Sequence, residues 1–312
     1  MPRADFAVHA NHAAQLVTTE GVSVREDVLY TSDKGEEKRG IRKRNEKQLR
    51  KLLPALTRVL LPDEAVLFLA PAHSPLSALE QLTAGWWTYY LAQCVIVVTN
   101  KRILFFPVKR DGTRKESARS VMWGDVAKIK RKGWLIRYVT FAFKNGSKVT
   151  YTHFKGVDAK KLAAIFSAAR LAGAADQSAS QGLAQLCPDC RNVLTAGVYS
   201  CGSCGLVFKN EKSMVMRSIF LPAGGYFYTG HPLIAVLPAI AEVILIFDIV
   251  LLLVTGLNKP EARSALMSAL TIFMLVWIFE TAITILHCRR YIRDYIPEKR
   301  DPNRAQVFAA GK

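Results

Sequence analysis

The sequence predicts a multidomain chain of α+β class with membrane helices. Short β-rich segments between about residues 64 and 156 predict a curled sheet, which an amphipathic helix closes. Two CxxC pairs within residues 187–204 predict a metal site. Two apolar stretches near the C-terminus are long enough to cross the hydrocarbon core of a bilayer.

Composition favours a membrane component with a basic soluble part. Half of the 312 residues are hydrophobic, the mean hydropathy is above zero, and the formal net charge is +18. Such a charge beside a membrane anchor favours anionic lipid as partner, with nucleic acid as the competing interpretation. Residues 1–17 contain no apolar core of signal-peptide length, so we expect the soluble part to stay in the cytoplasm.

Residues 1–54 are predicted to form a tail followed by a basic helix. Residues 1–33 lack sustained periodicity and are expected to be a tail or a loose cover. Residues 34–58 hold ten Lys/Arg and three Glu. Leucines at helical spacing predict an amphipathic helix, which Pro54 is expected to cut. This helix packs its leucines on the next domain or contacts lipid or nucleic acid.

Residues 55–172 are predicted to form one β-rich domain. Six runs, each bounded by Gly, Pro, Asn or Asp, are predicted strands: 67–70, 94–99, 103–108, 121–129, 134–143 and 148–154. Asn145-Gly146 favours a type I′ turn, which predicts that the last two runs pair as an antiparallel hairpin. Helical periodicity returns over residues 157–171.

Three features of this domain resemble bacterial pleckstrin-homology-like and GRAM-type domains. They are VIVVTNKRILFF at residues 95–106, the WGDVAKI strand at 123–129 and the terminal amphipathic helix. The resemblance implies a small β-barrel capped by a helix. Some relatives bind phosphoinositides through a basic loop, which here implies lipid-binding candidates Lys109, Arg110, Arg114, Lys115 and Arg119. Many other relatives bind proteins.

Residues 173–186 are small and polar and are predicted to be a flexible linker. They lead into a predicted zinc ribbon at residues 187–208, whose ligands are Cys187, Cys190, Cys201 and Cys204. Each CxxC forms a tight knuckle, and four thiolates fill the tetrahedral shell of Zn²⁺, so the ion is expected to be structural. A rubredoxin-type iron site uses the same ligands. A redox CxxC is the weaker alternative, because no thioredoxin-like context surrounds the pairs.

Residues 216–288 are predicted to form an interfacial segment and a two-span transmembrane hairpin. Spans at 232–254 and 265–286 are joined by a link too short for anything but an antiparallel pair. Eight Lys/Arg flank the ends and two lie in the link, which places both termini in the cytoplasm, with residues 289–312 as a basic tail. The glycines before Phe227-Tyr228-x-Gly230 resemble the entry motif of a family of small two-span domains.

Three acidic residues fall inside the predicted spans: Glu242, Asp248 and Glu280. An ionised carboxylate near the bilayer centre costs on the order of 3 kcal/mol. Glu242 and Asp248 point about 120° apart on one helix. Glu242 and Glu280 can meet across the hairpin and share a proton. Two explanations remain open, a proton or ion path and protonated acids satisfied by neighbouring helices in an oligomer.

No catalytic motif stands out, because the histidines are dispersed and no Gly-rich phosphate loop is present. The sequence therefore predicts a non-enzyme, a membrane-anchored adaptor, scaffold or sensor that faces the cytoplasm. Its expected partners are membrane lipids, anionic ones above all, and a protein or further copies of itself. Two alternatives are a subunit of an oligomeric channel or transporter that uses the intramembrane acids, and a membrane-tethered nucleic-acid binder.

Overall fold

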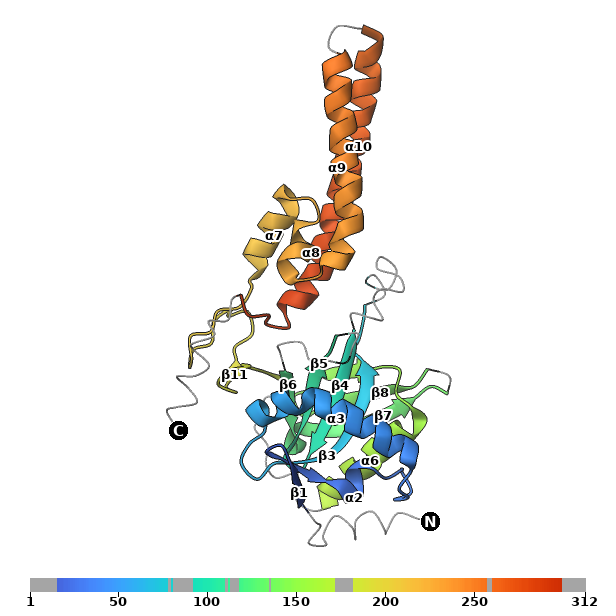
Figure 1. The fold of residues 1–312 in the computed structure, drawn as a ribbon, viewed down its shortest axis with the longest axis vertical. Coiled ribbons are helices and arrows are strands. Elements are labelled where there is room, and N and C mark those ends of the chain that lie inside the picture. Colours follow the sequence, from blue (N-terminus) through green and yellow to red (C-terminus); the bar gives the residue numbers. More distant parts are fainter. Residues whose placement is uncertain are drawn as a thin grey trace. The chain divides into compact units, whose positions relative to one another are not determined.

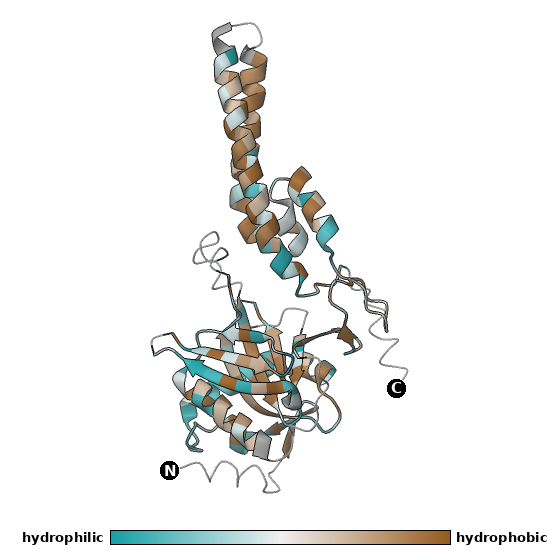
Figure 2. Cartoon of the chain, turned by 180° about the vertical axis from the view of Figure 1, so that it is seen from behind, coloured by the Kyte–Doolittle hydropathy of each residue, from teal (hydrophilic) through white to brown (hydrophobic). Residues whose placement is uncertain are grey.

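The computed structural model describes residues 16–77, 80, 92–109, 112, 118–134, 136–171, 182–256 and 260–298. The chain divides into two compact units, called unit 1 and unit 2 (Figure 1). The boundary between them in the sequence lies between Gly205 and Leu206. Hydrophobic residues dominate the long helices of unit 2, α9 (Pro232–Gly256) and α10 (Pro260–Ile292) (Figure 2). The α+β class with two apolar helices is therefore confirmed.

Unit 1 contains two sheets among its described residues. The larger has eight strands in the order β1-β2-β3-β4-β5-β6-β10-β11, and only the β2–β3 pair is parallel. The smaller has the order β7-β8-β9 and is antiparallel. Their bounds are β1 Leu16–Thr19, β2 Val22–Arg25, β3 Ala65–His73, β4 Gln93–Thr99, β5 Arg102–Pro107, β6 Ala118–Met122, β7 Val126–Lys132, β8 Tyr138–Phe143, β9 Lys148–Tyr151, β10 Ala184–Leu186 and β11 Val193–Leu194.

The predicted hairpin at Asn145-Gly146 is confirmed as the β8–β9 pair. Its turn is not type I′, because Gly146 has a φ of 82° while Asn145 has no positive φ. The Phe143 N–H instead donates to the Ser147 carbonyl, which makes the loop longer than two residues. Between the sheets, the 3₁₀ turn η1 (Trp123–Asp125) ends β6 and leads into β7. The predicted single run 121–129 is therefore two strands that belong to different sheets.

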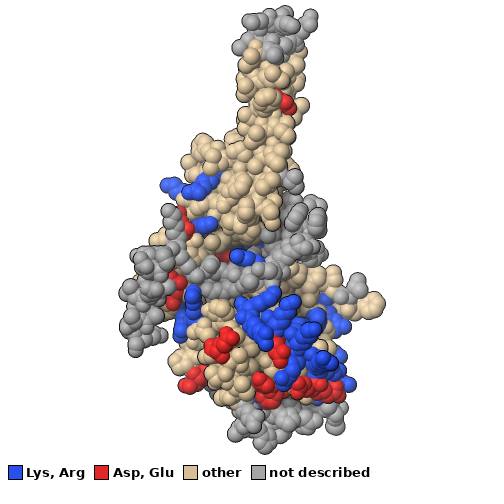
Figure 3. All heavy atoms as spheres, in the orientation of Figure 1, with Lys and Arg blue, Asp and Glu red and all other residues tan. Residues whose placement is uncertain are grey.

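The basic segment forms one helix, α3 (Arg39–Val59), which packs on one face of the larger sheet. Leu49, Leu52 and Leu53 are buried in a cluster with residues of β4 and β5. These leucines therefore pack on the β-rich domain and do not contact lipid or nucleic acid. The predicted break at Pro54 is wrong. Pro54 is exposed, and the burial of apolar residues on both sides of it offsets the roughly 3 kcal/mol cost of an interior proline. Lys and Arg gather over the outer face of α3 (Figure 3).

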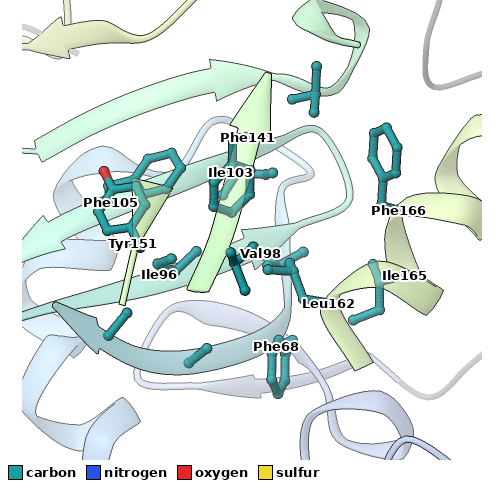
Figure 4. Packing of buried hydrophobic residues seen from close by; sticks show 14 of the residues in the cluster. Phe68, Ile96, Val98, Ile103, Phe105, Phe141, Tyr151, Leu162, Ile165 and Phe166 are labelled. Carbon is teal, nitrogen blue, oxygen red and sulfur yellow. The ribbon is translucent and has the colours of Figure 1, made fainter. Parts of the chain in front are cut away.

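The second core lies between the two sheets and α6 (Gly156–Leu171). Phe105 of β5 stacks on Tyr151 of β9 with ring centroids 4.9 Å apart, and Phe141 of β8 meets both rings edge-on (Figure 4). From α6, Leu162, Ile165 and Phe166 close the same core. Because β4 and β5 are covered on both faces, their sequences are nearly continuous apolar runs instead of alternating ones.

The expectation that residues 1–33 form a tail is wrong for residues 16–33, while residues 1–15 lie outside the described residues. β1 and β2 extend the larger sheet, and the short helix α2 (Glu26–Leu29) follows them. Val22, Val24 and Leu29 are at most 1% exposed. Two buried polar residues also bind this segment, since Asn45 of α3 donates to the Leu29 carbonyl at 2.7 Å, and Lys161 of α6 donates to the carbonyls of Val28 and Thr31.

The predicted linker at residues 173–186 is also corrected at its C-terminal end. Residues 184–186 form β10, which pairs with β6 and β11. Leu186 is 2% exposed, so its burial against the larger sheet favours a strand over a solvated linker. Residues 173–181 lie outside the described residues.

Lys161 predicts a pH dependence of stability. Burial lowers the pKa of Lys161 to about 7 against an ordinary 10.5, although the nearby Asp158 opposes this shift. The folded chain therefore binds fewer protons than the unfolded chain between these two pKa values, so stability rises with pH across that window. We expect a slope of up to about 1.4 kcal/mol per pH unit in denaturant unfolding of the detergent-solubilised chain.

The Lys161→Met variant should lose this slope, because Met fills the same volume and does not titrate. Lys160→Met, on the neighbouring exposed residue, is the matched control and should keep it. Equal slopes in wild type and Lys161→Met would show that the buried amine does not titrate in this range.

Unit 2 contains four helices among its described residues: α7 (Glu211–Phe220), α8 (Gly224–Thr229), α9 and α10. Asn210 caps α7 by accepting from the Ser213 N–H at 2.8 Å. Gly225 lets α8 approach its neighbours closely, because a Cβ there would lie 2.3 Å from Ser218 Oγ and 2.8 Å from Thr284 Cγ2. The predicted interfacial segment is therefore two short helices packed along the base of the hairpin.

The two ends of unit 2 are hydrogen-bonded to each other. Lys209 N–H donates to the Ile296 carbonyl at 2.8 Å, and Glu298 N–H donates to the Val207 carbonyl at 3.0 Å. Phe208 and Pro297 form the bridge between them. The chain therefore enters and leaves unit 2 at the same end, as an antiparallel hairpin requires.

Candidate functional site

The four predicted cysteine ligands lie together at the end of unit 1. Their sulfur atoms all lie within 4.8 Å of one another, and none is in a disulfide. Cys187 Sγ and Cys204 Sγ are 3.6 Å apart, and Cys190 Sγ and Cys201 Sγ are 3.4 Å apart. A tetrahedral ion with metal–sulfur bonds of about 2.3 Å would hold its sulfurs about 3.8 Å apart. The cluster is therefore suited to one metal ion.

The two CxxC turns have the same backbone geometry. In the first, the Arg191 N–H donates to the Cys187 carbonyl at 3.0 Å, and in the second the Gly205 N–H donates to the Cys201 carbonyl at 2.8 Å. Arg191 and Gly205 both have a φ of 68°. Glycine adopts this conformation freely, whereas arginine rarely does.

Arg191 compensates by binding α3. Its guanidinium donates to the Leu60 carbonyl at 3.2 Å and to the Thr57 carbonyl at 3.4 Å. These bonds satisfy carbonyls at the C-terminal end of α3 and attach the first CxxC turn to the folded core of unit 1. The cluster is thus held by β10, by β11 and by the bonds from Arg191 to the distant C-terminal end of α3.

The thiols have unequal affinities for protons. Burial raises the pKa of Cys187 well above its ordinary range and that of Cys190 to about 11. Burial also acts on Cys201, but the N–H groups of Cys204 and Ser203 bond to its sulfur and bring its pKa down to about 7. A bound cation stabilises all four thiolates, since metal coordination requires the deprotonated form.

The apolar hairpin of unit 2 has two helices that are long and apolar enough to cross a membrane, Pro232–Val254 and Arg263–Ile292. Large apolar side chains point outward along both, with Phe247 and Leu275 each 65% exposed. Such a surface is costly in water and favourable in lipid. The described flanking cations Lys209, Lys212, Arg217, Arg289, Arg290 and Arg293 belong to the end where the chain enters and leaves.

The structure separates the three acids of the hairpin. Asp248 is exposed, whereas Glu242 is 5% exposed and lies within hydrogen-bonding reach of the Glu280 carboxyl. Glu280 accepts from Thr284 Oγ1 at 2.7 Å, while Glu242 Oε1 is buried without a hydrogen-bond partner among the residues that the structure describes. Glu242 and Glu280 are thus brought together and Asp248 is left out, as their helical spacing indicates.

Sequence reasoning missed a polar pair close to these acids. The Tyr226 hydroxyl and His287 Nδ1 are 2.6 Å apart, and both residues are less than 8% exposed. Tyr226 comes from α8 and His287 from α10, and no spacing in the sequence connects them. This pair fastens α8 to the base of the hairpin.

The proposed lipid-binding loop is only partly visible in the structure. Arg110, Arg114 and Lys115 lie outside the described residues. Lys109 is exposed just beyond the end of β5. Arg119 is not in a loop, because it lies on β6 and donates to Gln185 of β10 at 3.2 Å. Pairing with β10 removes Arg119 from the predicted cluster.

No family model matches this chain, and no curated protein matches it. Among solved structures, the "Vps36 N-terminal PH domain" matches with 15% sequence identity and a TM-score of 0.26. The match covers 36% of this chain and 84% of that one. Likeness at this level identifies no family for the chain.

Proposed function

We propose that this protein is a membrane-anchored adaptor or sensor without catalytic chemistry of its own. The apolar hairpin crosses the bilayer twice, and unit 1 faces the cytoplasm and binds an anionic lipid surface or a protein. The observation that carries this proposal is that the two ends of unit 2 are hydrogen-bonded to each other. The chain therefore enters and leaves the hairpin on the same side. Six described Lys/Arg flank that end, as the positive-inside rule requires of a cytoplasmic face.

Within this proposal the four cysteines hold a structural zinc ion. A shell of four thiolates leaves no position for water or substrate, so the ion braces the fold instead of catalysing a reaction. The ribbon is the last part of unit 1 before the chain enters unit 2. Its role is to fix the C-terminal end of unit 1, where the pull of a membrane anchor would otherwise unravel β10 and β11.

The strand arrangement of unit 1 supports the part of this proposal that makes it a pleckstrin-homology-like binding domain. From β3 to β9, seven antiparallel strands form two sheets around one core, and α6 closes it. This supports a binding role for unit 1 in the proposal, because such folds present loops and surfaces rather than a reactive cleft.

The buried acids favour a second candidate, a subunit of an oligomeric channel or transporter. Within the described part of the chain, one buried oxygen of Glu242 has no hydrogen-bond partner, and the residue lies next to Glu280. Acids at this depth mark ion or proton routes in many membrane proteins. One copy provides two spans, so a route requires several copies. Loss of ion flux in Glu242→Gln proteoliposomes, with assembly unchanged, would favour this candidate.

The adaptor proposal is tested with the full chain in lipid nanodiscs. Discs of phosphatidylcholine alone are compared with discs that also contain phosphatidylserine, and amide hydrogen exchange is followed across unit 1. We expect slower exchange on basic surfaces of unit 1 in anionic discs only, and recovery of fast exchange in high salt. Unchanged exchange throughout unit 1 would contradict lipid binding. Slower exchange on adding DNA, in neutral discs, would favour a nucleic-acid binder.

A further inference from the structure

The turn between β7 and β8 combines exposed cations with an exposed aromatic side chain. Residues 126–138 contain five Lys/Arg and no Asp or Glu. Trp134 is 88% exposed and Ile136 is 37% exposed. A tryptophan is usually buried in a folded protein, so one left almost fully in solvent at the tip of a hairpin indicates a contact made outside the chain.

Gly133 fixes the shape of this turn. It has a φ of 83°, and a Cβ at this position would lie 2.0 Å from the Ile136 carbonyl oxygen. Only glycine fits both conditions. The tight turn holds Trp134 away from the core that Val139 and Phe141 of β8 enter. Exposure of Trp134 is therefore set by the backbone.

A basic hollow lies beside the turn, with an open volume of about 460 Å³. Four of the residues that line it are cations, two from β7, one from the residue just before β8 and one from α6: Arg131, Lys132, Arg137 and Lys160. No ion pair or hydrogen bond joins any of them to a carboxylate within the part of the chain that the structure describes. The hollow is large enough for a phosphate headgroup.

Two cations of α3, Arg42 and Arg44, are differently placed. Arg42 pairs with Glu37 at 2.6 Å, and Arg44 makes two bonds to the buried Asp158. Their charges are thus partly neutralised within unit 1. The β7–β8 turn carries no such acids, so its field reaches further into solvent.

Edge protection explains part of this composition. Among the described strands, β7 pairs only with β8 and is an edge strand of the smaller sheet, where lysines prevent edge-to-edge association. That accounts for Lys128, Lys130 and Lys132 on β7. It does not account for Trp134 at the tip, because an exposed aromatic promotes association.

We infer that the β7–β8 turn is the membrane-docking element of unit 1. Its partner is the surface of an anionic phospholipid bilayer. Trp134 lies in the interfacial layer, and headgroup phosphates enter the hollow lined by Arg131, Arg137 and Lys160. Each cation near such a surface contributes about 1 kcal/mol, and tryptophan favours the interface. This inference rests on the proposed function and names the surface that performs it.

The test measures contact between Trp134 and lipid in the full chain. Wild type and Trp134→Phe are placed in nanodiscs with brominated acyl chains, which quench the fluorescence of nearby tryptophans. The difference in quenching between the two proteins reports Trp134 separately from Trp277 of α10. We expect a quenched component that depends on Trp134 in discs containing phosphatidylserine. It should be absent in discs of phosphatidylcholine alone.

Charge variants complete the design. Lys130→Glu/Lys132→Glu should lower the equilibrium constant for contact more than about tenfold, since four charge units near the surface are lost. The matched control, Lys43→Glu/Lys47→Glu, makes the same change on exposed residues of α3 and should leave the quenching largely intact. Equal losses in both pairs, or equal quenching in wild type and Trp134→Phe, would overturn the inference. If exchange in unit 1 still slows in anionic discs, the proposed function stands and only the docking element is wrong.

Discussion

Replacing Cys201 by Ser is expected to abolish metal binding. The wild-type chain should retain one zinc ion per molecule after purification, and the variant essentially none, because three thiolates leave the tetrahedral shell of a structural site incomplete and weaken its hold on the ion. Elemental mass spectrometry of the full chain in detergent measures the metal and its identity. Residues 184–205 should then become the first site of proteolytic cleavage, since β10 and β11 are short and depend on the cluster.

Cys94→Ala is the control for this experiment. Cys94 is buried in β4, far along the chain from the CxxC turns, and is not among the clustered cysteines. Its replacement should leave the metal content at one ion per chain. Full metal content in Cys201→Ser, or no metal in the wild type, would contradict the zinc ribbon. Iron in place of zinc would keep the site and change its ion.

Arg102→Met is expected to destabilise unit 1 by about 3–5 kcal/mol, because it leaves the Glu64 carboxylate buried without its counter-charge. The Glu64 side chain is fully buried, and Arg102 Nε and Nη2 each donate to it at 3.0 Å. Arg102 also donates to the Val59 carbonyl at 2.7 Å, at the end of α3. Denaturant unfolding, followed by the fluorescence of the buried Trp123, measures the loss.

Two variants separate a charge effect from a packing effect. In Glu64→Leu/Arg102→Met neither charge remains, and much of the stability should return, because an apolar pair of similar volume replaces a desolvated ion pair. Lys43→Met on the exposed face of α3 should leave the unfolding midpoint unchanged. A double variant as unstable as Arg102→Met would show that the loss comes from packing.

The same ion pair belongs to the Thr99–Arg102 turn, which lies within the VIVVTNKRILFF segment at residues 95–106. Thr99 Oγ1 donates to the Glu64 carboxylate at 2.7 Å, and its carbonyl accepts from the Trp123 indole at 2.9 Å. Asn100 accepts from the Ala65 N–H at 2.9 Å. The turn thus joins β3, η1 and α3, and its polar residues each have a partner inside unit 1.

The sequence by itself determined the features that depend on local spacing. Two CxxC pairs ten residues apart predicted the cysteine cluster, and apolar runs of span length predicted α9 and α10, because knuckle geometry and helix length are local properties. The meeting of Glu242 and Glu280 followed from their positions on two antiparallel helices. The basic composition of residues 128–138 can also be read from the sequence. Its interpretation as a docking surface depends on the exposure of Trp134, which only the structure gives.

Only the tertiary structure decided which segments join the core. Residues 16–33 have no period that marks them as ordered, yet Val22, Val24 and Leu29 are buried because β3 offers them an edge. Pro54 would end an isolated helix, whereas in α3 the sheet beneath it supplies the missing stability. Arg119 is a strand residue because β6 pairs with β5 on one side and with β10 on the other. In each case a contact between residues far apart in sequence outweighed local preference, and such contacts are set by the fold as a whole.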